Sequence, residues 1–183
     1  QLVASLGDQT AVCETEQVTV RSVRWPVLPG VTGEGLLLEP KGQPRFQVVA
    51  IPDADWTAEV LAGIDQGPFP TAAFAQRLAE SGGRVLVPQL INRSDRWSGN
   101  PKIRMLNQPH REFVYRPAFY LGRHLIGYEV QKVLSAVDYF FNQRDNNSAI
   151  GVAGYGEGAL VALYSAAADR RAATAGCRAP APR

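Results

Sequence analysis

The sequence IGVAGYGEGA, residues 150–159, decides the fold of this chain. Ala149 to Ala153 is a short apolar run, the pattern of a strand that is covered on both faces. An alanine- and leucine-rich stretch, Gly158 to Ala168, follows at once and predicts a helix. Three alternating glycines join the two elements: Gly154, Gly156 and Gly158. The segment therefore predicts a very tight turn from a buried strand into a helix, with Gly156 at its apex.

Further apolar runs upstream extend this pattern. Phe46 to Ile51 (FQVVAI) and Arg84 to Pro88 (RVLVP) predict two more buried strands. Thr71 to Ser81 predicts a helix between them, and Gly127 to Phe141 predicts a second helix before residue 150. The apolar stripe of that second helix is Val130, Val133, Leu134, Val137, Phe140 and Phe141. Alternating strands and helices predict a mostly parallel sheet with helices on both faces.

The two ends of the chain depart from this alternation. Val18 to Val23 and Gly35 to Glu39 predict two opening strands at an antiparallel edge, and Trp25-Pro26 is expected to break the first. Arg170 to Arg183 shows no periodicity and few apolar residues, so we expect a disordered tail. The sequence predicts one domain over residues 1–169, with a three-layer α/β fold truncated after the helix at 158–168.

Composition limits the classes of partner. The formal net charge is +2, which gives no reason to expect a nucleic acid or a membrane. Cys13 and Cys177 are far apart and favour neither a disulfide framework nor a zinc site, and we expect no metal or cofactor. The chain does not begin with Met. We therefore expect either that an upstream segment, such as a signal peptide, was removed or that the sequence is a fragment. Compartment and oligomeric state stay open.

The glycine-rich turn matches two functional motifs. In the nucleophile elbow, G-x-S-x-G, the residues two positions from the nucleophile must be small, and Gly154 and Gly158 satisfy this. The nucleophile position then falls on Gly156, which has no side chain. The same letters match the dinucleotide fingerprint G-x-G-x-x-A through Ala159, which normally follows the first strand of its sheet. The elbow is favoured; the fingerprint and a purely structural turn remain alternatives.

A family resemblance supports the elbow. GRHLIGYEVQKVLSAVDYF (residues 122–140) and IGVAGYGEGALVALYSAAAD (residues 150–169) resemble the dienelactone hydrolase and acetyl xylan esterase-like branch of the α/β-hydrolases. The resemblance extends over about residues 35 to 169. It implies an α/β-hydrolase fold and hydrolysis of carboxylic esters or lactones by a nucleophile, an acid and a histidine, without a metal.

The sequence departs from that family pattern at all three catalytic positions. Gly156 replaces the nucleophile. The acid and the histidine should both follow the elbow, yet Asp169 is the one acidic residue after Gly158. His110 and His124, the two histidines, both lie upstream, where we expect surface or core roles. We therefore expect an ester hydrolase-type domain that is inactive as written.

The backbone donors of an oxyanion hole do not depend on side chains, so this part of the site is expected to remain. The resemblance assigns one donor to the N–H of Glu157 and the other to the turn that follows Ile51. The candidate pocket at these donors comprises Asp53, Ala54, Asp55, Trp56 and Tyr155. Such a site could bind a carboxylate or carbonyl without cleaving it.

The segment Gln89 to Ile126 is long for a connection and interleaves arginines with aromatic residues. It is expected either to cap the mouth of the site or to be an ordinary packed excursion. Beside the hydrolase hypothesis we therefore retain a non-catalytic module that binds a sugar or acyl ligand. A dinucleotide-binding domain is the third alternative. The expected partner is a small-molecule ester or sugar.

Overall fold

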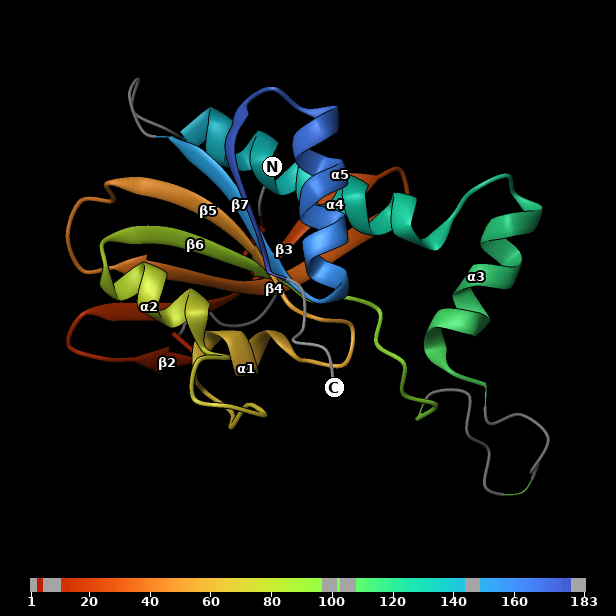
Figure 1. The fold of residues 1–183 in the computed structure, drawn as a ribbon, viewed down its shortest axis with the longest axis horizontal. Helices are drawn as coiled ribbons and strands as arrows, with labels where there is room; N and C mark the ends of the chain where they lie inside the picture. The colour runs from red at the N-terminus through yellow and green to blue at the C-terminus, as the bar shows by residue number, and fades with distance from the viewer. Residues whose placement is uncertain (1–2, 5–10, 97–101, 103–107, 144–148, 179–183) are drawn as a thin grey trace.

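The computed structural model describes residues 3–4, 11–96, 102, 108–143 and 149–178 (Figure 1). A central sheet lies between two helical layers, with α1 and α2 on one face and α4 and α5 on the other. The strands are β1 (Val3–Ala4), β2 (Cys13–Glu14), β3 (Val18–Leu28), β4 (Val31–Pro40), β5 (Phe46–Ile51), β6 (Gly83–Pro88), β7 (Ile150–Tyr155) and β8 (Ala172–Arg178). The helices are α1 (Ala58–Ala62), α2 (Phe74–Glu80), α3 (His110–Tyr120), α4 (Leu125–Gln143) and α5 (Glu157–Ala168). The predicted three-layer α/β organisation is confirmed.

The sheet is antiparallel in its first half and parallel in its second. Its order is β1-β3-β4-β6-β5-β7-β8, with β2 paired to β3. The pairs β3–β4 and β4–β6 are antiparallel, whereas β6, β5, β7 and β8 run parallel to one another. The antiparallel part is thus larger than the sequence predicted, because β4 pairs with β6 as well as with β3.

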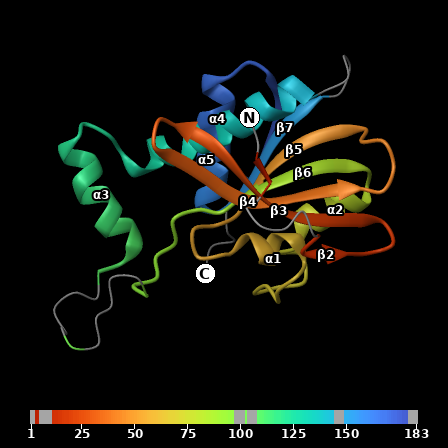
Figure 2. The same ribbon diagram turned by 180° about the vertical axis from the view of Figure 1, so that it is seen from behind.

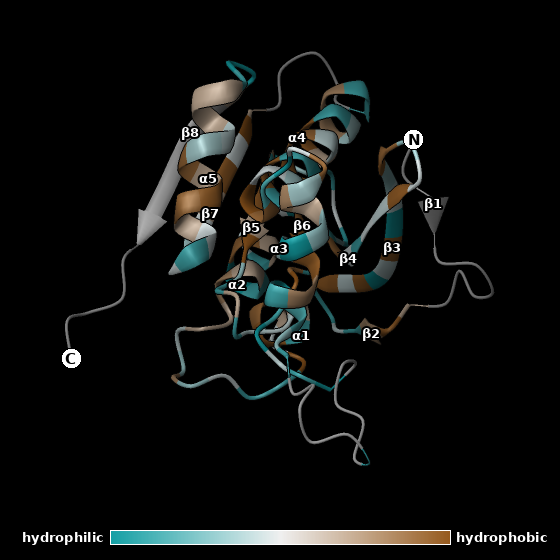
Figure 3. Cartoon of the chain, turned by 90° about the vertical axis from the view of Figure 1, so that its right-hand side faces the viewer, coloured by the Kyte–Doolittle hydropathy of each residue, from teal (hydrophilic) through white to brown (hydrophobic). Residues whose placement is uncertain are grey.

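Alternating side chains of the strands build a core on each face of the sheet. Leu37 and Leu86 belong to the core under α4 and α5, whereas Leu38 and Val85 belong to the core under α1 and α2. Figure 3 shows the apolar strands between the helices of the two faces. The α4 stripe enters the first core through Val133, Val137 and Phe140, which are fully buried; Val130, Leu134 and Phe141 are half-buried. The predicted amphipathic helix therefore covers the sheet as expected.

A buried ion pair on α4 fixes the segment that leaves β6. Glu129 is fully buried, and its carboxylate accepts the N–H of Ile91 at 2.9 Å and the Nζ of Lys132 at 2.8 Å. Lys132 also donates to the carbonyl of Gln89 at 2.8 Å. Charges in the interior are tolerated when they are paired and hydrogen-bonded. The pair therefore ties residues 89–91 to α4.

Two predicted boundaries were wrong, and the segment after β6 contains a helix that was not predicted. β3 does not break at Trp25-Pro26 but continues to Leu28. Residues 172–178 form β8, paired in parallel with β7, where the sequence predicted a disordered tail and an end after α5; residues 179–183 lie outside the described residues. The long segment after β6 contains α3, which stands away from the sheet in both views (Figures 1 and 2).

Candidate functional site

The sheet has a topological switch point beside β5. From β5 the chain passes through α1 and α2 to β6 on one side, and from β6 it passes through α4 to β7 on the other side. α1 and α2, which follow β5, and α5, which follows β7, cover opposite faces, so the two segments diverge at the carboxyl ends of these strands. Open α/β sheets bind ligands in the crevice formed at such a point. Topology therefore places the candidate site at residues 52–56 and 155–157.

The turn between β7 and α5 has the geometry that the sequence predicts. Gly156 is the N-cap of α5, with φ 57° and ψ −124°, a conformation that residues with a Cβ rarely adopt. A Cβ at Gly154 would lie 2.2 Å from the carbonyl oxygen of Gly158, and one at Gly158 would lie 2.2 Å from that of Pro52. Residues 154–158 are hereafter called the elbow. Its apex and its small neighbours are where the nucleophile-elbow motif requires them.

The carboxylate of Asp53 occupies the space beside the apex. Its Oδ1 atom accepts the N–H of Glu157 at 2.9 Å and the N–H of Ala54 at 2.9 Å. These are the two regions from which the sequence predicted oxyanion-hole donors. A Cβ at Gly156 would lie 2.6 Å from Asp53 Cγ and 2.7 to 2.8 Å from its two oxygens. Asp53 therefore points inward and takes up both donors.

The Glu157 side chain is held by two arginines of the long segment after β6. Its carboxylate pairs with Arg93 at 2.8 Å and with Arg111, and Arg93 also pairs with Asp55 at 2.7 Å. The side chains of Glu157 and Arg111 are only 17% and 13% exposed. The carboxylate beside the elbow is therefore paired with cations and largely shielded from solvent. The arginine content of residues 89–126 was visible in the sequence, but its pairing with Glu157 was not.

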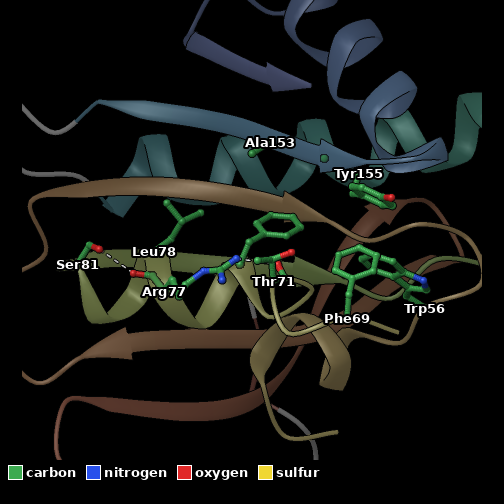
Figure 4. Close-up of a pocket in the computed structure, with 10 residues that line it drawn as sticks. Trp56, Phe69, Thr71, Arg77, Leu78, Ser81, Ala153 and Tyr155 are labelled. Atoms are coloured by element: carbon green, nitrogen blue, oxygen red, sulfur yellow. Dashed lines mark hydrogen bonds between the residues drawn. The ribbon is translucent and has the colours of Figure 1, made fainter. Parts of the chain in front are cut away.

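An aromatic wall adjoins the elbow. Trp56 and Tyr155 stack with ring centroids 4.7 Å apart, and Phe69 meets both rings edge-on at 5.3 and 5.6 Å. The three rings line one end of a cavity of about 460 Å³ that continues along β7 and α2 to Arg77 (Figure 4). The predicted pocket residues Trp56 and Tyr155 are thus brought together, and Phe69 is an additional member. Such apolar pockets with few polar groups are the usual sites of small ligands.

The remaining candidates for acid and base lie on other elements. Asp169 follows the last turn of α5, at the opposite end from the elbow, and pairs with Arg171. A helix of this length separates its two ends by about 18 Å, so this carboxylate does not reach the apex. His110 is buried at the start of α3, and its backbone N–H donates to the carbonyl of Ser94 at 2.8 Å. His124 accepts the N–H of Ile126 at 3.1 Å and packs edge-on against Tyr115.

Two further properties of the described residues concern metal ions and membranes. Within them, no group of three or more histidine, cysteine or acidic side chains is placed to hold a metal ion. No helix in the same residues combines the length and apolarity needed to cross a bilayer.

The comparisons with known proteins concern the fold. No protein-family model and no curated protein matched the chain. A crystal structure of a protein proposed to be an acetyl xylan esterase, from Bacteroides fragilis, matches 86% of this chain with a TM-score of 0.68 and 18% identity. The acetyl xylan esterase of Paenibacillus sp. R4 matches 95% of it with a TM-score of 0.58 and 17% identity. The dienelactone hydrolase of Anabaena variabilis matches 90% with a TM-score of 0.54 and 18% identity.

These matches cover 44%, 52% and 63% of the three solved chains. The present chain therefore spans about half the length of the structures that it resembles. At this level of identity the likeness concerns the fold alone. The chain has the α/β-hydrolase fold, in the form found in acetyl xylan esterases and dienelactone hydrolase.

Proposed function

We propose that residues 1–183 form an ester hydrolase-type domain that does not cleave esters, because its elbow has no nucleophile. One observation carries this proposal: Gly156 lies at the apex, and the Asp53 carboxylate fills the space where a nucleophile's side chain would begin. Covalent acyl transfer needs an attacking group and a base that hydrogen-bonds it. Gly156 supplies no hydroxyl or thiol at this apex, and the carboxylate beside it accepts two backbone N–H groups.

The arrangement of donors adds a second reason. Oxyanion stabilisation needs N–H groups aimed at the position where negative charge develops. The N–H groups of Ala54 and Glu157 already donate to Asp53, so a substrate carbonyl would have to displace a carboxylate from them. An ester carbonyl is a weaker hydrogen-bond acceptor than a carboxylate, which disfavours that exchange.

Turnover of p-nitrophenyl acetate by the purified chain tests this proposal. We expect a linear, unsaturable release of p-nitrophenol, at a rate that falls when His124, which is exposed, is replaced by alanine. Exposed imidazoles and amines react with activated esters, so this background is the appropriate reference. Saturable turnover that Gly156→Ala abolishes in a folded variant would show a working site and overturn the proposal.

A second candidate function is the binding of a small acyl ligand without chemistry. The observation that favours it is the cavity of about 460 Å³ with the rings of Trp56, Phe69 and Tyr155 at the elbow end. The charged group that lines this cavity is Arg77, which extends from α2 toward Thr71 (Figure 4). Its Nη2 atom donates to the carbonyl of Thr71 at 2.7 Å. A short fatty acid matches an apolar cavity that is lined by one cation.

Calorimetric titration with hexanoate tests the binding function. Saturable binding is expected, and both Tyr155→Ala and Arg77→Gln should weaken it. Tyr120→Ala is the matched control, because this tyrosine is 88% exposed on α3 and does not line the cavity. Equal heats from hexanoate, xylose and buffer would exclude an acyl-binding role for the cavity.

A further inference from the structure

Helix α3 has little of the packing that usually stabilises a short helix. Only His110 and Ala118 of its 11 residues are buried, and Pro117 lies inside it. An isolated helix of this length is marginal in water, and tertiary packing of one face normally stabilises it. An internal proline removes a backbone hydrogen bond and weakens the helix further. Because α3 stands away from the sheet in both views (Figures 1 and 2), its stability calls for contact with another surface.

α3 and the residue that follows it expose large apolar side chains. Phe119, Tyr120 and Leu121 are 64%, 88% and 75% exposed, and Phe113 is 59% exposed. Since an aromatic side chain has about 150–250 Å² of surface, these four residues leave on the order of 500 Å² of apolar surface open. A standard protein interface buries about 800 Å² on each partner, of which roughly 60% is apolar. This surface therefore supplies about the apolar area that a stable dimer needs.

A groove of about 390 Å³ separates α3 from the body of the domain. Side chains of α3, β4, α4 and the intervening segments line it, among them Val31, Ile91, Phe113, Pro117, Leu121 and Tyr128. Phe119 and Tyr120, hereafter called the ridge, do not line it. The same helix thus carries an exposed aromatic ridge and forms one wall of an apolar groove.

This surface is complementary to itself. A two-fold axis that brings the ridge of one copy to the groove of a second copy also brings the second ridge to the first groove, so both contacts form at once. The charged side chains of α3 are paired within one copy, Arg111 with Glu157 and Arg116 with Glu112. No unpaired charge of α3 therefore opposes the approach of a second α3.

We propose that the chain forms a two-fold symmetric homodimer through α3, in which the ridge of each copy fills the groove of the other. The dimer gives α3 the packing that it lacks within one copy. Because α3 also carries Arg111, the dimer holds this arginine against Glu157, beside the elbow. The proposal does not depend on whether the chain cleaves an ester.

Sedimentation equilibrium of the purified chain tests the proposal. We expect a reversible equilibrium between monomer and dimer at protein concentrations between about 1 μM and about 1 mM. Tyr120→Arg should raise the dissociation constant of the dimer at least about tenfold, because it removes an aromatic anchor and places a charge in an apolar groove. Leu163→Arg is the matched control, because Leu163 is an apolar residue of α5 that is 52% exposed. It should leave the dissociation constant unchanged.

Two outcomes of sedimentation would contradict the proposal. One is a chain that stays monomeric throughout this range of concentration. The other is a dimer that Tyr120→Arg weakens no more than Leu163→Arg does, which would place the interface elsewhere. Circular dichroism verifies that each variant is folded. Should Tyr120→Arg not fold, Phe119→Ser takes its place, and the same weakening of the dimer is expected.

Isotope-filtered NOE spectroscopy locates the contact between copies. In an equal mixture of ¹³C-labelled and unlabelled protein, we expect cross-peaks between copies from the ring of Tyr120 to the methyl groups of Val31 and Ile91. These two residues line the groove, and the ridge reaches them only if it enters the groove of the other copy. A dimer without these cross-peaks would overturn the placement of the ridge in the groove.

Discussion

Gly156 and Asp53 exclude each other's side chains: a Cβ at residue 156 would lie 2.6 Å from Cγ of Asp53. The relationship joins the end of β7 to the end of β5, the two strands that flank the topological switch point. Because of this steric conflict, we expect that a serine introduced at residue 156 alone does not restore a nucleophile in the geometry of the motif. The serine would compete with Asp53 for the same space.

The first prediction concerns this pair. Gly156→Ala should lower the free energy of unfolding by about 1–3 kcal/mol, because φ 57° is strained for a residue with a Cβ and because Asp53 must leave its donors. The double variant Asp53→Ala/Gly156→Ala should lose less than the sum of the two single losses, since the steric conflict is then gone. Urea denaturation of the four proteins measures the difference. Additive losses, within about 0.5 kcal/mol, would show that the two side chains do not interact.

The second prediction concerns the anchoring of the long segment after β6. Glu157→Ala should cost about 1–3 kcal/mol of unfolding free energy, because it leaves Arg111, whose side chain is 13% exposed, without this carboxylate. The control is Glu112→Ala, which breaks the exposed i,i+4 pair with Arg116 on the same helix and should cost less than about 0.5 kcal/mol. Equal losses from the two variants would mean that the Arg111–Glu157 pair is not a specific anchor.

The sequence predicted those strands that are continuous apolar runs. β5 and β6 were recognisable because FQVVAI and RVLVP are covered on both faces. β8 was not, because AATAGCR has little apolar character and its strand conformation comes from backbone pairing with β7. β3 continues through Pro26: in the described residues β1 pairs with Val23 and Arg24, and the register of β3 with β4 shifts between Pro26 and Leu28.

The candidate site was predictable in position but not in its contacts. Gly154, Gly156 and Gly158 identify the elbow from sequence spacing alone, since each fills a separate steric requirement of the turn. The inward rotamer of Asp53 could not be predicted, because it depends on an N–H group 104 positions away. The same holds for Phe69, which reaches Trp56 and Tyr155 only through the path of the loop between α1 and α2.

The third prediction concerns the buried pair on α4. Glu129→Ala should cost about 3–5 kcal/mol, because it leaves the Lys132 ammonium and the Ile91 N–H in the interior without this acceptor. Glu129→Leu/Lys132→Met should cost less than Glu129→Ala, since neither charge then remains buried. Chemical denaturation measures both. A double variant that is less stable than Glu129→Ala would mean that the hydrogen bonds to Gln89 and Ile91 matter more than the buried charge.

The fourth prediction concerns the pH dependence of folding stability that arises at the junction between α5 and β8. Hydrogen bonds from Arg171 hold the pKa of Asp169 below its ordinary value of 3.8, and burial opposes them only in part. A lowered pKa in the folded state means that the stabilisation is present in full above pH 3.8 and is lost as the pH falls through the lower folded pKa. Arg171 is 38% exposed, so solvent screening keeps the contribution below about 1 kcal/mol.

Thermal unfolding between about pH 6 and about pH 2 measures this contribution. Asp169→Asn should have a lower Tm than the wild type at pH 6, and the two curves should converge in acid, where the wild-type carboxyl is protonated. Glu14→Gln is the control: the pKa of Glu14 is also lowered, by Lys41, but the two side chains are 58% and 43% exposed, so this variant should change the Tm less. Because Asp169 and Arg171 flank the start of β8, a Tm difference that stays constant with pH would mean that the pairing of β8 with β7 does not depend on this ion pair.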